Sequence, residues 1–505
     1  MGDEPAAAPR DGRGGEDGQP DAGPLFYAFC AALLFAGLWL RPMFSSLWLD
    51  ELGTWWVIKD SFSDTLDRAL EYHGQSPAFY VIAWAAKTIG GAREQILRLP
   101  SLAAMSGAVF VTYRLARRLF DSETGRLTIV TFAASGSLAF AASEARPYAI
   151  GILVLVGSTL TLVVWLDDAR HRWGLLYVAL AVATLWLNYV FGLALVGHAV
   201  YAIVQMRRGD STLSWRGIMI AWVSVLLLLT PLVSQLSSLW SRREALSVPY
   251  DPVPLDLLVA VVPAFLGGAF LLGALLARSQ GPFHVEPGPQ QNGAWALLVP
   301  WVVVPPGVLL ALTAWADVQV ASSRYYLSAA PATAILLAWG LRAIRPVGAR
   351  RIMVAMLAIT SVMVSGGALK AGEDWAGAAA FVRASSSEET PLLLHPAFVE
   401  SRDLRWFEDP ERVSYLTSPI AFYPMPGEIE LVPYVLDDDA KRYMARLLDD
   451  VSSQTDRFVF VTRYPHVPWR EWMDGRLGVR GWRSDEIGRF GDVRVVAFTR
   501  PDVGG

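Results

Sequence analysis

The chain has 505 residues, of which 53% are hydrophobic and only 18% are charged. Soluble proteins carry about 25% charged residues, and the apolar residues here gather in blocks of about 17 to 23, long enough to cross a hydrocarbon layer about 30 Å thick. A soluble globular protein is therefore excluded. The formal net charge of −4 excludes a basic nucleic-acid binder. The single cysteine, Cys30, excludes an intrachain disulfide and a metal site built from cysteines.

Residues 1–24 consist mainly of glycine, proline, alanine and charged residues, without apolar periodicity. Such a segment cannot bury enough apolar surface to compensate for the entropy lost on ordering. We therefore expect a disordered tail.

The following sequence contains twelve apolar blocks, at 25–41, 76–90, 99–117, 126–142, 147–166, 174–188, 190–206, 216–235, 255–277, 294–315, 325–343 and 350–368. The second block is the shortest. If it lies along the membrane surface, the arginine-rich connections near residues 114–126, 170–172, 207–216 and 342–351 all fall on one side, which the positive-inside rule makes cytoplasmic. We therefore predict about eleven spans, with the N-terminus in the cytoplasm. A twelve-span topology, in which 76–90 crosses the membrane, is the alternative.

After about Lys370 the charged residues return, and short β-rich runs occur at 392–394, 457–462 and 493–499. Helical patterns lie between them, at 375–382 and 438–448. Alternating helices and buried strands indicate a small α/β domain. The predicted organisation is thus a membrane domain over residues 25–369 and a soluble extracytoplasmic domain over 370–505.

The predicted topology places an unusual set of polar residues on the outer face, namely Asp50, Glu51, His73, Gln75, Glu144, Arg146, Tyr148, Asn188, Tyr189, Arg242, Arg243, Arg324 and Tyr325. A carboxylate among interfacial tryptophans, as at Asp50, can act as a general base. Arginines beside tyrosines, as at Arg146 and Arg324, can grip two phosphate oxygens. The simpler readings are a solvated turn at Asp50, headgroup anchors at the two arginines, and a local salt bridge from Glu144.

Several motifs occur in a fixed order, namely Asp50-Glu51, His73-Gly74-Gln75-Ser76-Pro77-Ala78-Phe79-Tyr80, Arg98-Leu99-Pro100-Ser101, Glu144-Ala145-Arg146-Pro147-Tyr148-Ala149, Asn188-Tyr189-Val190-Phe191-Gly192, Arg324-Tyr325-Tyr326 and Glu373-Asp374-Trp375. In this order they resemble the GT-C superfamily of membrane glycosyltransferases. More narrowly, they are similar to bacterial relatives of the dolichyl-phosphate-mannose protein mannosyltransferases and of the lipid A aminoarabinose transferases. The resemblance covers about residues 25–385.

The resemblance implies an all-α polytopic membrane bundle whose first outer loop, residues 42–98, carries surface-lying helices. It also implies an inverting transfer of a sugar from a polyprenyl-phosphate donor to an acceptor hydroxyl. Asp50 would be the general base, with Glu51 as a neighbouring catalytic residue that could take its place, and Arg146 and Arg324 would hold the carrier phosphate. The remaining substrate contacts would come from His73, Gln75, Tyr80, Glu144, Tyr148, Asn188, Tyr189 and Tyr325. Relatives often have His-Tyr at 188–189, so the asparagine here weakens a metal-ligand role, and an obligatory divalent metal is not favoured.

Two other classes of function remain as alternatives. A transporter or flippase of a lipid-linked sugar would place ionisable residues near the bilayer midplane and often shows two similar halves. A non-catalytic protein could use the bundle as an anchor for a binding domain. The expected partners are the bilayer, a polyprenyl-phosphate-linked sugar, and an acceptor protein, glycan or glycolipid, with no nucleic acid. The expected location is the bacterial inner membrane.

Overall fold

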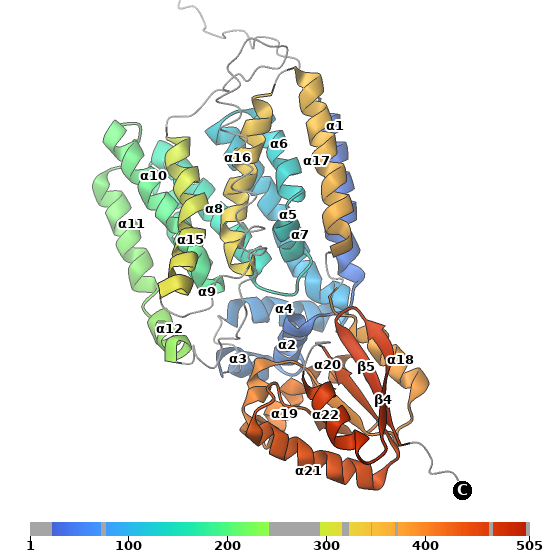
Figure 1. Ribbon diagram of the computed structural model, residues 1–505. Coiled ribbons are helices and arrows are strands. Elements are labelled where there is room, and N and C mark those ends of the chain that lie inside the picture. Colours follow the sequence, from blue (N-terminus) through green and yellow to red (C-terminus); the bar gives the residue numbers. More distant parts are fainter. Residues whose placement is uncertain are drawn as a thin grey trace, which may run out of the picture.

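A computed structural model gives the fold and describes residues 23–71, 77–241, 293–315, 323–344, 346–368, 372–463 and 468–500. Three parts follow one another along the long axis of the molecule: a helical bundle, a layer of short helices, and a C-terminal domain with a sheet (Figure 1). The predicted tail and the predicted span at 255–277 lie outside the described residues, apart from the last two residues of the tail.

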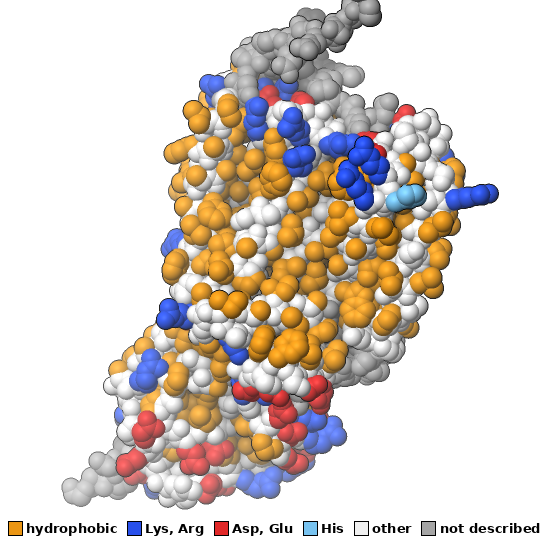
Figure 2. Space-filling model, turned by 180° about the vertical axis from the view of Figure 1, so that it is seen from behind, with side chains coloured by type: hydrophobic (Ala, Val, Ile, Leu, Met, Phe, Trp, Pro, Cys, Tyr) orange, Lys and Arg blue, Asp and Glu red, His pale blue; other side chains and the backbone are white. Residues whose placement is uncertain are grey.

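The bundle is built from apolar helices that bury one side against each other and leave the other exposed. Large exposed side chains such as Phe29, Phe110, Ile220 and Met363 form the apolar outer surface of the bundle. In the space-filling view hydrophobic side chains cover this part of the molecule (Figure 2). The bundle helices are α1 (Pro24–Leu34), α5 (Glu94–Leu119), α6 (Ser122–Ala133), α7 (Gly136–Ala142), α8 (Tyr148–Asp167), α9 (His171–Leu187), α10 (Leu195–Arg208), α11 (Trp215–Leu228), α12 (Leu232–Ser241), α15 (Ala294–Trp315), α16 (Ala330–Arg342) and α17 (Val347–Ala368).

The predicted count of about eleven spans is not confirmed. Among the described residues six helices are long and apolar enough to cross a membrane, or seven if a bent pair counts as one span. The bent pair is α6 and α7, which meet at 72°, so the predicted straight span over 126–142 is broken. α9 and α11 are apolar but shorter than a full crossing, and α16 has only 13 residues.

The arginine-rich connections meet at the end of the bundle that lies away from the C-terminal domain, as their charge pattern predicted. Arg118 at the end of α5 pairs with Asp167 at the end of α8 (2.6 Å). Arg342 of α16 pairs with Asp121 (3.1 Å) just before α6. Lys and Arg side chains gather at this end in the space-filling view (Figure 2).

Three short helices, α2 (Leu49–Ile58), α3 (Phe62–Glu71) and α4 (Pro77–Gly90), lie between the bundle and the C-terminal domain (Figure 1). α4 is not among the six candidate spans. Lys87 near its end donates hydrogen bonds to the carbonyl oxygens of Ile58 (2.6 Å) and Lys59 (2.9 Å), the last of which is the C-cap of α2. This contact satisfies carbonyls that have no partner within α2 and ties the two helices together.

The C-terminal domain contains a five-stranded sheet in the order β2-β1-β3-β5-β4. β1 (Leu392–His395) runs parallel to β2 (Ile429–Leu431) and β3 (Arg457–Thr462), whereas β5 (Val493–Thr499) runs antiparallel to β3 and β4 (Arg483–Phe490). β1, β3 and β5 match the predicted strands. β2 and β4 were not predicted, because their side chains are largely exposed and give no apolar run.

The two faces of the sheet pack differently. Alternate residues such as Leu393, Phe458 and Phe460 pack on α21 (Asp438–Gln454) and α22 (Trp469–Gly478). The residues between them join a second apolar cluster with α18 (Trp375–Ser385), α19 (Pro410–Leu416), α20 (Ser418–Phe422) and the helices α2 and α4. This shared cluster fixes the C-terminal domain on the layer of short helices.

Candidate active site

Asp50 lies in the first turn of α2, where three segments that are distant in the sequence meet. Its Oδ2 is 2.7 Å from Nη1 of Arg324 and 3.8 Å from Nη2 of Arg146. Arg146 also donates a hydrogen bond from Nη1 to the carbonyl oxygen of Asp50 (3.4 Å). The side chain of Asp50 is 27% exposed. Two of the predicted residues therefore flank the partly exposed carboxylate of a third.

Tyrosines complete this cluster. The guanidinium carbon of Arg146 is 5.9 Å from the ring centre of Tyr148, and that of Arg324 is 5.4 Å from the ring centre of Tyr325. Burial raises the pKa of Tyr80, in α4, to about 12, although the charge of Arg146 opposes this shift. Tyr80 is therefore a neutral hydroxyl at neutral pH and can donate a hydrogen bond.

Arg146 and Arg324 bring two positive charges to the single carboxylate of Asp50. The Nε atom of each arginine is buried and has no hydrogen-bond partner in the described part of the chain. Guanidinium groups with unused donors suit a phosphate, whose oxygens accept several charge-assisted hydrogen bonds. The arrangement can thus hold an anion beside a general base.

Glu51 has a very different environment from that of its neighbour Asp50. Its side chain is fully buried, and its oxygens accept hydrogen bonds from Nε (2.8 Å) and Nη2 (2.5 Å) of Arg98 and from the backbone N–H of Ala145 (2.8 Å). Arg98 also donates to four carbonyl oxygens at the end of the first span and directly after it, those of Pro42, Met43, Ser45 and Ser46. The geometry favours a positioning role for Glu51 over the predicted catalytic one, because its carboxylate is held away from the exposed side of the site.

Glu144 is also fully buried, although it was predicted to contact substrate. Its Oε2 accepts a hydrogen bond from the indole N–H of Trp48 (2.5 Å), the residue before α2. Together with the contact from Glu51 to Ala145, this bond fixes the start of α2 against the segment that carries Arg146. Glu144 therefore contributes to placing the site residues.

Two further residues that were predicted to contact substrate, Asn188 and Tyr189, lie on the connection between α9 and α10. Asn188 accepts a hydrogen bond from the backbone N–H of Val190 (3.1 Å) and caps η3 (Tyr189–Ala194). Its Cβ also lies beside Gly151, less than one turn after Tyr148 in α8. Tyr189 donates a hydrogen bond to Gln235 of α12 (2.6 Å). His73 and Gln75 lie outside the described residues.

Glu373 connects the C-terminal domain to the first turn of α2. It is nearly fully buried and accepts hydrogen bonds from the backbone N–H of Leu49 (3.0 Å) and the indole of Trp375 (2.9 Å). Arg463 at the end of β3 forms an ion pair with it (2.6 Å). The sequence motif Glu373-Asp374-Trp375 signalled this residue, but not its contact next to Asp50.

Sequence reasoning missed Glu400, which lies in η5 (Val399–Arg402). Burial, and to a smaller extent the negative charge of Asp50, raises the pKa of its carboxyl to about 7. The nearby Ala397 has a φ of 62°, a left-handed conformation that costs a non-glycine residue about 1–2 kcal/mol. Glu400 therefore follows a strained turn of the C-terminal domain. Its carboxyl group lies close enough to Asp50 to be affected by the charge of that residue.

No group of three or more His, Cys, Asp or Glu side chains that could hold a metal ion occurs among the described residues. Glu51 and Glu373 each meet an arginine. Asp50 can provide acid–base catalysis, and Arg146 and Arg324 can bind an anion.

Comparison with known families and structures gives matches for part of the sequence and for the fold. Residues 74–234 match the family described as dolichyl-phosphate-mannose-protein mannosyltransferase. No curated protein matches the sequence.

Among solved structures, the chain is similar to ArnT from Cupriavidus metallidurans in the apo state, with a TM-score of 0.56, 15% sequence identity, and coverage of 94% of this chain and 97% of that one. ArnT from Cupriavidus metallidurans bound to undecaprenyl phosphate gives a TM-score of 0.55 at 14% identity, with 95% and 98% covered. Residues 74–234 thus resemble a mannosyltransferase family, as the motifs predicted, and the chain as a whole shares the fold of ArnT.

Replacing Arg98 by methionine should destabilise the protein strongly, because it leaves the buried carboxylate of Glu51 without its partner. Breaking such a pair costs about 3–5 kcal/mol. Thermal unfolding of the purified protein in detergent measures the loss. In the matched control, Arg405→Met breaks the exposed pair with Asp403 (2.6 Å) and should change the stability little, because water screens such a pair. Equal losses in the two variants would contradict a structural role for the buried pair.

Glu400→Gln should weaken the pH dependence of stability. The pKa of Glu400 is about 7 in the folded state, above the ordinary value of 4.5. The stability that protonated Glu400 contributes is therefore fully present below pH 4.5. It is lost as the pH rises through the folded-state pKa. The wild type should therefore lose on the order of 2 kcal/mol more than Glu400→Gln between acidic and mildly alkaline pH. Unfolding midpoints at the two pH values measure this, and Glu408→Gln, at an exposed position, should behave as the wild type. If Glu400→Gln lost as much stability between the two pH values as the wild type does, Glu400 would have an ordinary pKa in the folded protein.

Proposed function

We propose that this protein transfers a sugar from a polyprenyl-phosphate-linked donor to an acceptor hydroxyl, at the end of the bundle covered by the C-terminal domain. The observation that carries the proposal is the partly exposed carboxylate of Asp50 between Arg146 and Arg324. The mannosyltransferase family match over residues 74–234 supports it. So does the fold shared with ArnT, one structure of which contains undecaprenyl phosphate.

In this reaction Asp50 accepts the proton of the acceptor hydroxyl while the hydroxyl oxygen attacks the anomeric carbon of the sugar. The bond between that carbon and the phosphate oxygen breaks, and its electron pair stays on the phosphate. Attack opposite to the leaving group inverts the anomeric centre. Arg146 and Arg324 stabilise the charge that grows on the leaving phosphate. Electrostatic stabilisation of this kind is usually the largest single contribution to an enzyme's rate acceleration. The products are the glycoside, the polyprenyl phosphate and a proton, which Asp50 passes on.

Asp50 and Arg324 form an ion pair (2.7 Å). A phosphate that binds Arg324 competes with Asp50 for the same guanidinium. The donor would thereby release the carboxylate that the next step needs as a base. Tyr80, Tyr148 and Tyr325 then line the site as neutral groups that can contact phosphate or sugar.

We further propose that the catalytic end of the bundle faces the outside of a bacterial inner membrane. The arginine-rich connections at the opposite end support a cytoplasmic location for that end. The N-terminus would then be cytoplasmic and residues 370–505 extracytoplasmic. With Glu373 and Glu400 close to Asp50, the C-terminal domain would form one wall of the site and take part in binding the acceptor.

Asp50→Asn and Asp50→Ala should each abolish sugar transfer, because neither side chain can accept the proton. Loss of a general base lowers rates by about 10² to 10⁴. Mass spectrometry of membrane lipids and glycans measures this in cells that lack the protein and carry each variant in its place. Asp67→Asn, at an exposed position in α3, is the matched control and should restore the missing glycan. Full restoration by both Asp50 variants would overturn the proposed role.

Undecaprenyl phosphate should stabilise the purified wild-type protein against heat, since a ligand that binds only the folded state raises its stability. Arg146→Gln and Arg324→Gln should each weaken that effect, with a loss in affinity of roughly tenfold per arginine. Thermal unfolding in detergent at rising lipid concentration gives the affinities. Arg405→Gln, at an exposed arginine of the C-terminal domain, is the control. Unchanged affinity in both site variants would place the phosphate elsewhere.

A further inference from the structure

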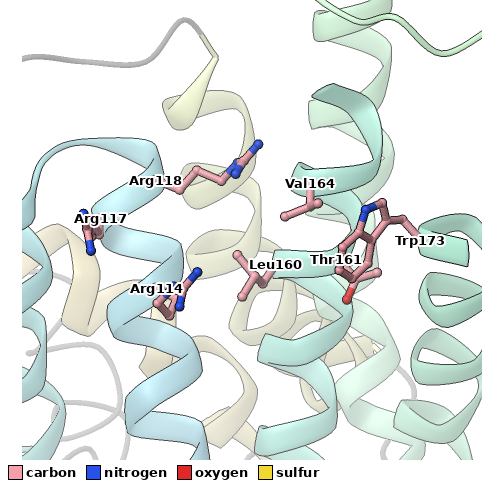
Figure 3. A pocket seen from close by; sticks show the side chains of 7 residues that line it. All are labelled: Arg114, Arg117, Arg118, Leu160, Thr161, Val164 and Trp173. Carbon is pink, nitrogen blue, oxygen red and sulfur yellow. The ribbon is translucent and has the colours of Figure 1, made fainter. Parts of the chain in front are cut away.

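A cavity lies at the end of the bundle that is far from Asp50. It has a volume of about 560 Å³ and lies between α5, α8 and α9. Figure 3 shows Arg114 and Arg118 of α5 facing α8, with Trp173 of α9 on the opposite wall. The lining consists of Arg114, Arg117, Arg118, Leu160, Thr161, Val164 and Trp173.

The cavity carries an excess of positive charge. Arg118 is neutralised by Asp167 at 2.6 Å. Arg114 and Arg117 have no carboxylate partner among the described residues, and the guanidinium of Arg114 lies 5.9 Å from the ring centre of Phe110. Two cations on one wall of a cavity attract an anion with at least one full negative charge.

The depth and lining of the cavity indicate what kind of anion fits. Arg114 precedes Arg118 by one helical turn, which places it about 6 Å deeper along α5, toward the centre of the bilayer. An arginine at such a depth is costly unless it reaches the headgroups or meets an anion. Leu160 and Val164 of α8 give the same cavity an aliphatic wall. Arginines at the membrane surface beside an aliphatic wall suit a molecule with a charged head and a hydrocarbon chain.

Trp173 supplies a second, independent observation. Its indole Nε1 is buried and has no hydrogen-bond partner in the part of the chain that the structure describes. Leaving a buried N–H unpaired is unfavourable. A phosphate group in the cavity would accept this hydrogen bond and lie within the positive charge of Arg114.

We propose that this cavity binds the phosphate headgroup of an anionic membrane lipid in the leaflet that lies away from the C-terminal domain. The headgroup lies between Arg114 and Trp173, with Arg117 adding positive charge from the other side of α5, and an acyl chain follows Leu160 and Val164. Inorganic phosphate offers the same headgroup chemistry without a chain, so the aliphatic wall favours the lipid. The site is separate from Asp50 and does not depend on the proposed transfer reaction.

Native mass spectrometry of the purified full-length protein with added phosphatidylglycerol tests the site. The wild type should retain one phosphatidylglycerol molecule more tightly than phosphatidylcholine, which has no net charge. The double variant Arg114→Gln/Arg117→Gln should lose affinity for phosphatidylglycerol by about fivefold for each arginine removed. Trp173→Phe keeps the ring but removes the N–H, and should lose about three- to tenfold.

Arg207→Gln/Arg208→Gln is the matched control, because this exposed pair in the last turn of α10 lies at the same end but does not line the cavity. Retention of phosphatidylglycerol in this control, together with its loss in the cavity variants, supports the site. An equal loss in both double variants would mean general attraction to a basic surface and would overturn the proposal. Equal retention of phosphatidylcholine, or displacement of phosphatidylglycerol by millimolar inorganic phosphate, would also overturn it.

Discussion

The buried ion pair between Glu51 and Arg98 is the contact on which the rest of the site depends. Arg98 enters from α5 and donates to carbonyl oxygens at the end of the first span and directly after it, which fixes the chain before α2. Glu51 holds Arg98 and also binds the backbone of Ala145, which precedes Arg146. A charge pair without solvent is stable only when its remaining donors and acceptors are satisfied. Here those donors and acceptors hold α2, α5 and the start of α8 in one arrangement, so that Asp50 and Arg146 meet.

The C-terminal domain is a structural part of this arrangement. Glu373 accepts the backbone N–H of Leu49, directly before Asp50. Tyr423 of the same domain accepts the backbone N–H of Leu47 (2.8 Å) and donates to Glu94 at the start of α5 (3.0 Å). These contacts and the shared apolar cluster place the domain against the entrance of α2. The junction between the two parts, rather than either part alone, therefore shapes the candidate site.

The sequence predicts what local patterns control. The positions of the arginines predicted which connections between helices meet at one end of the bundle. Short β-rich runs predicted β1, β3 and β5. The motifs containing Asp50, Arg146 and Arg324 predicted residues that the structure brings together. Other features arise only from tertiary packing. Glu51 and Asp50 are equivalent in the sequence, and only the approach of Arg98 from α5 makes one buried and leaves the other accessible. Glu400 follows a left-handed alanine in a segment without any motif, and the bend between α6 and α7 interrupts an apolar run that looks continuous.

The pairing of Asp50 with Arg324 implies an order of events. A carboxylate paired with a guanidinium is a weaker proton acceptor than a free one, because the opposite charge favours its ionised form. In the proposed reaction, the arginine that suits the donor phosphate would therefore also weaken Asp50 as a base. An anion of higher charge than Asp50 competes for Arg324, and a partly exposed pair can exchange partners at lower cost than a buried one. Glu51 has no such freedom, since Arg98 is fully enclosed. In the proposed reaction the two adjacent acidic residues thus have complementary roles: the buried one keeps the geometry constant, and the exposed one would change partner when the donor binds.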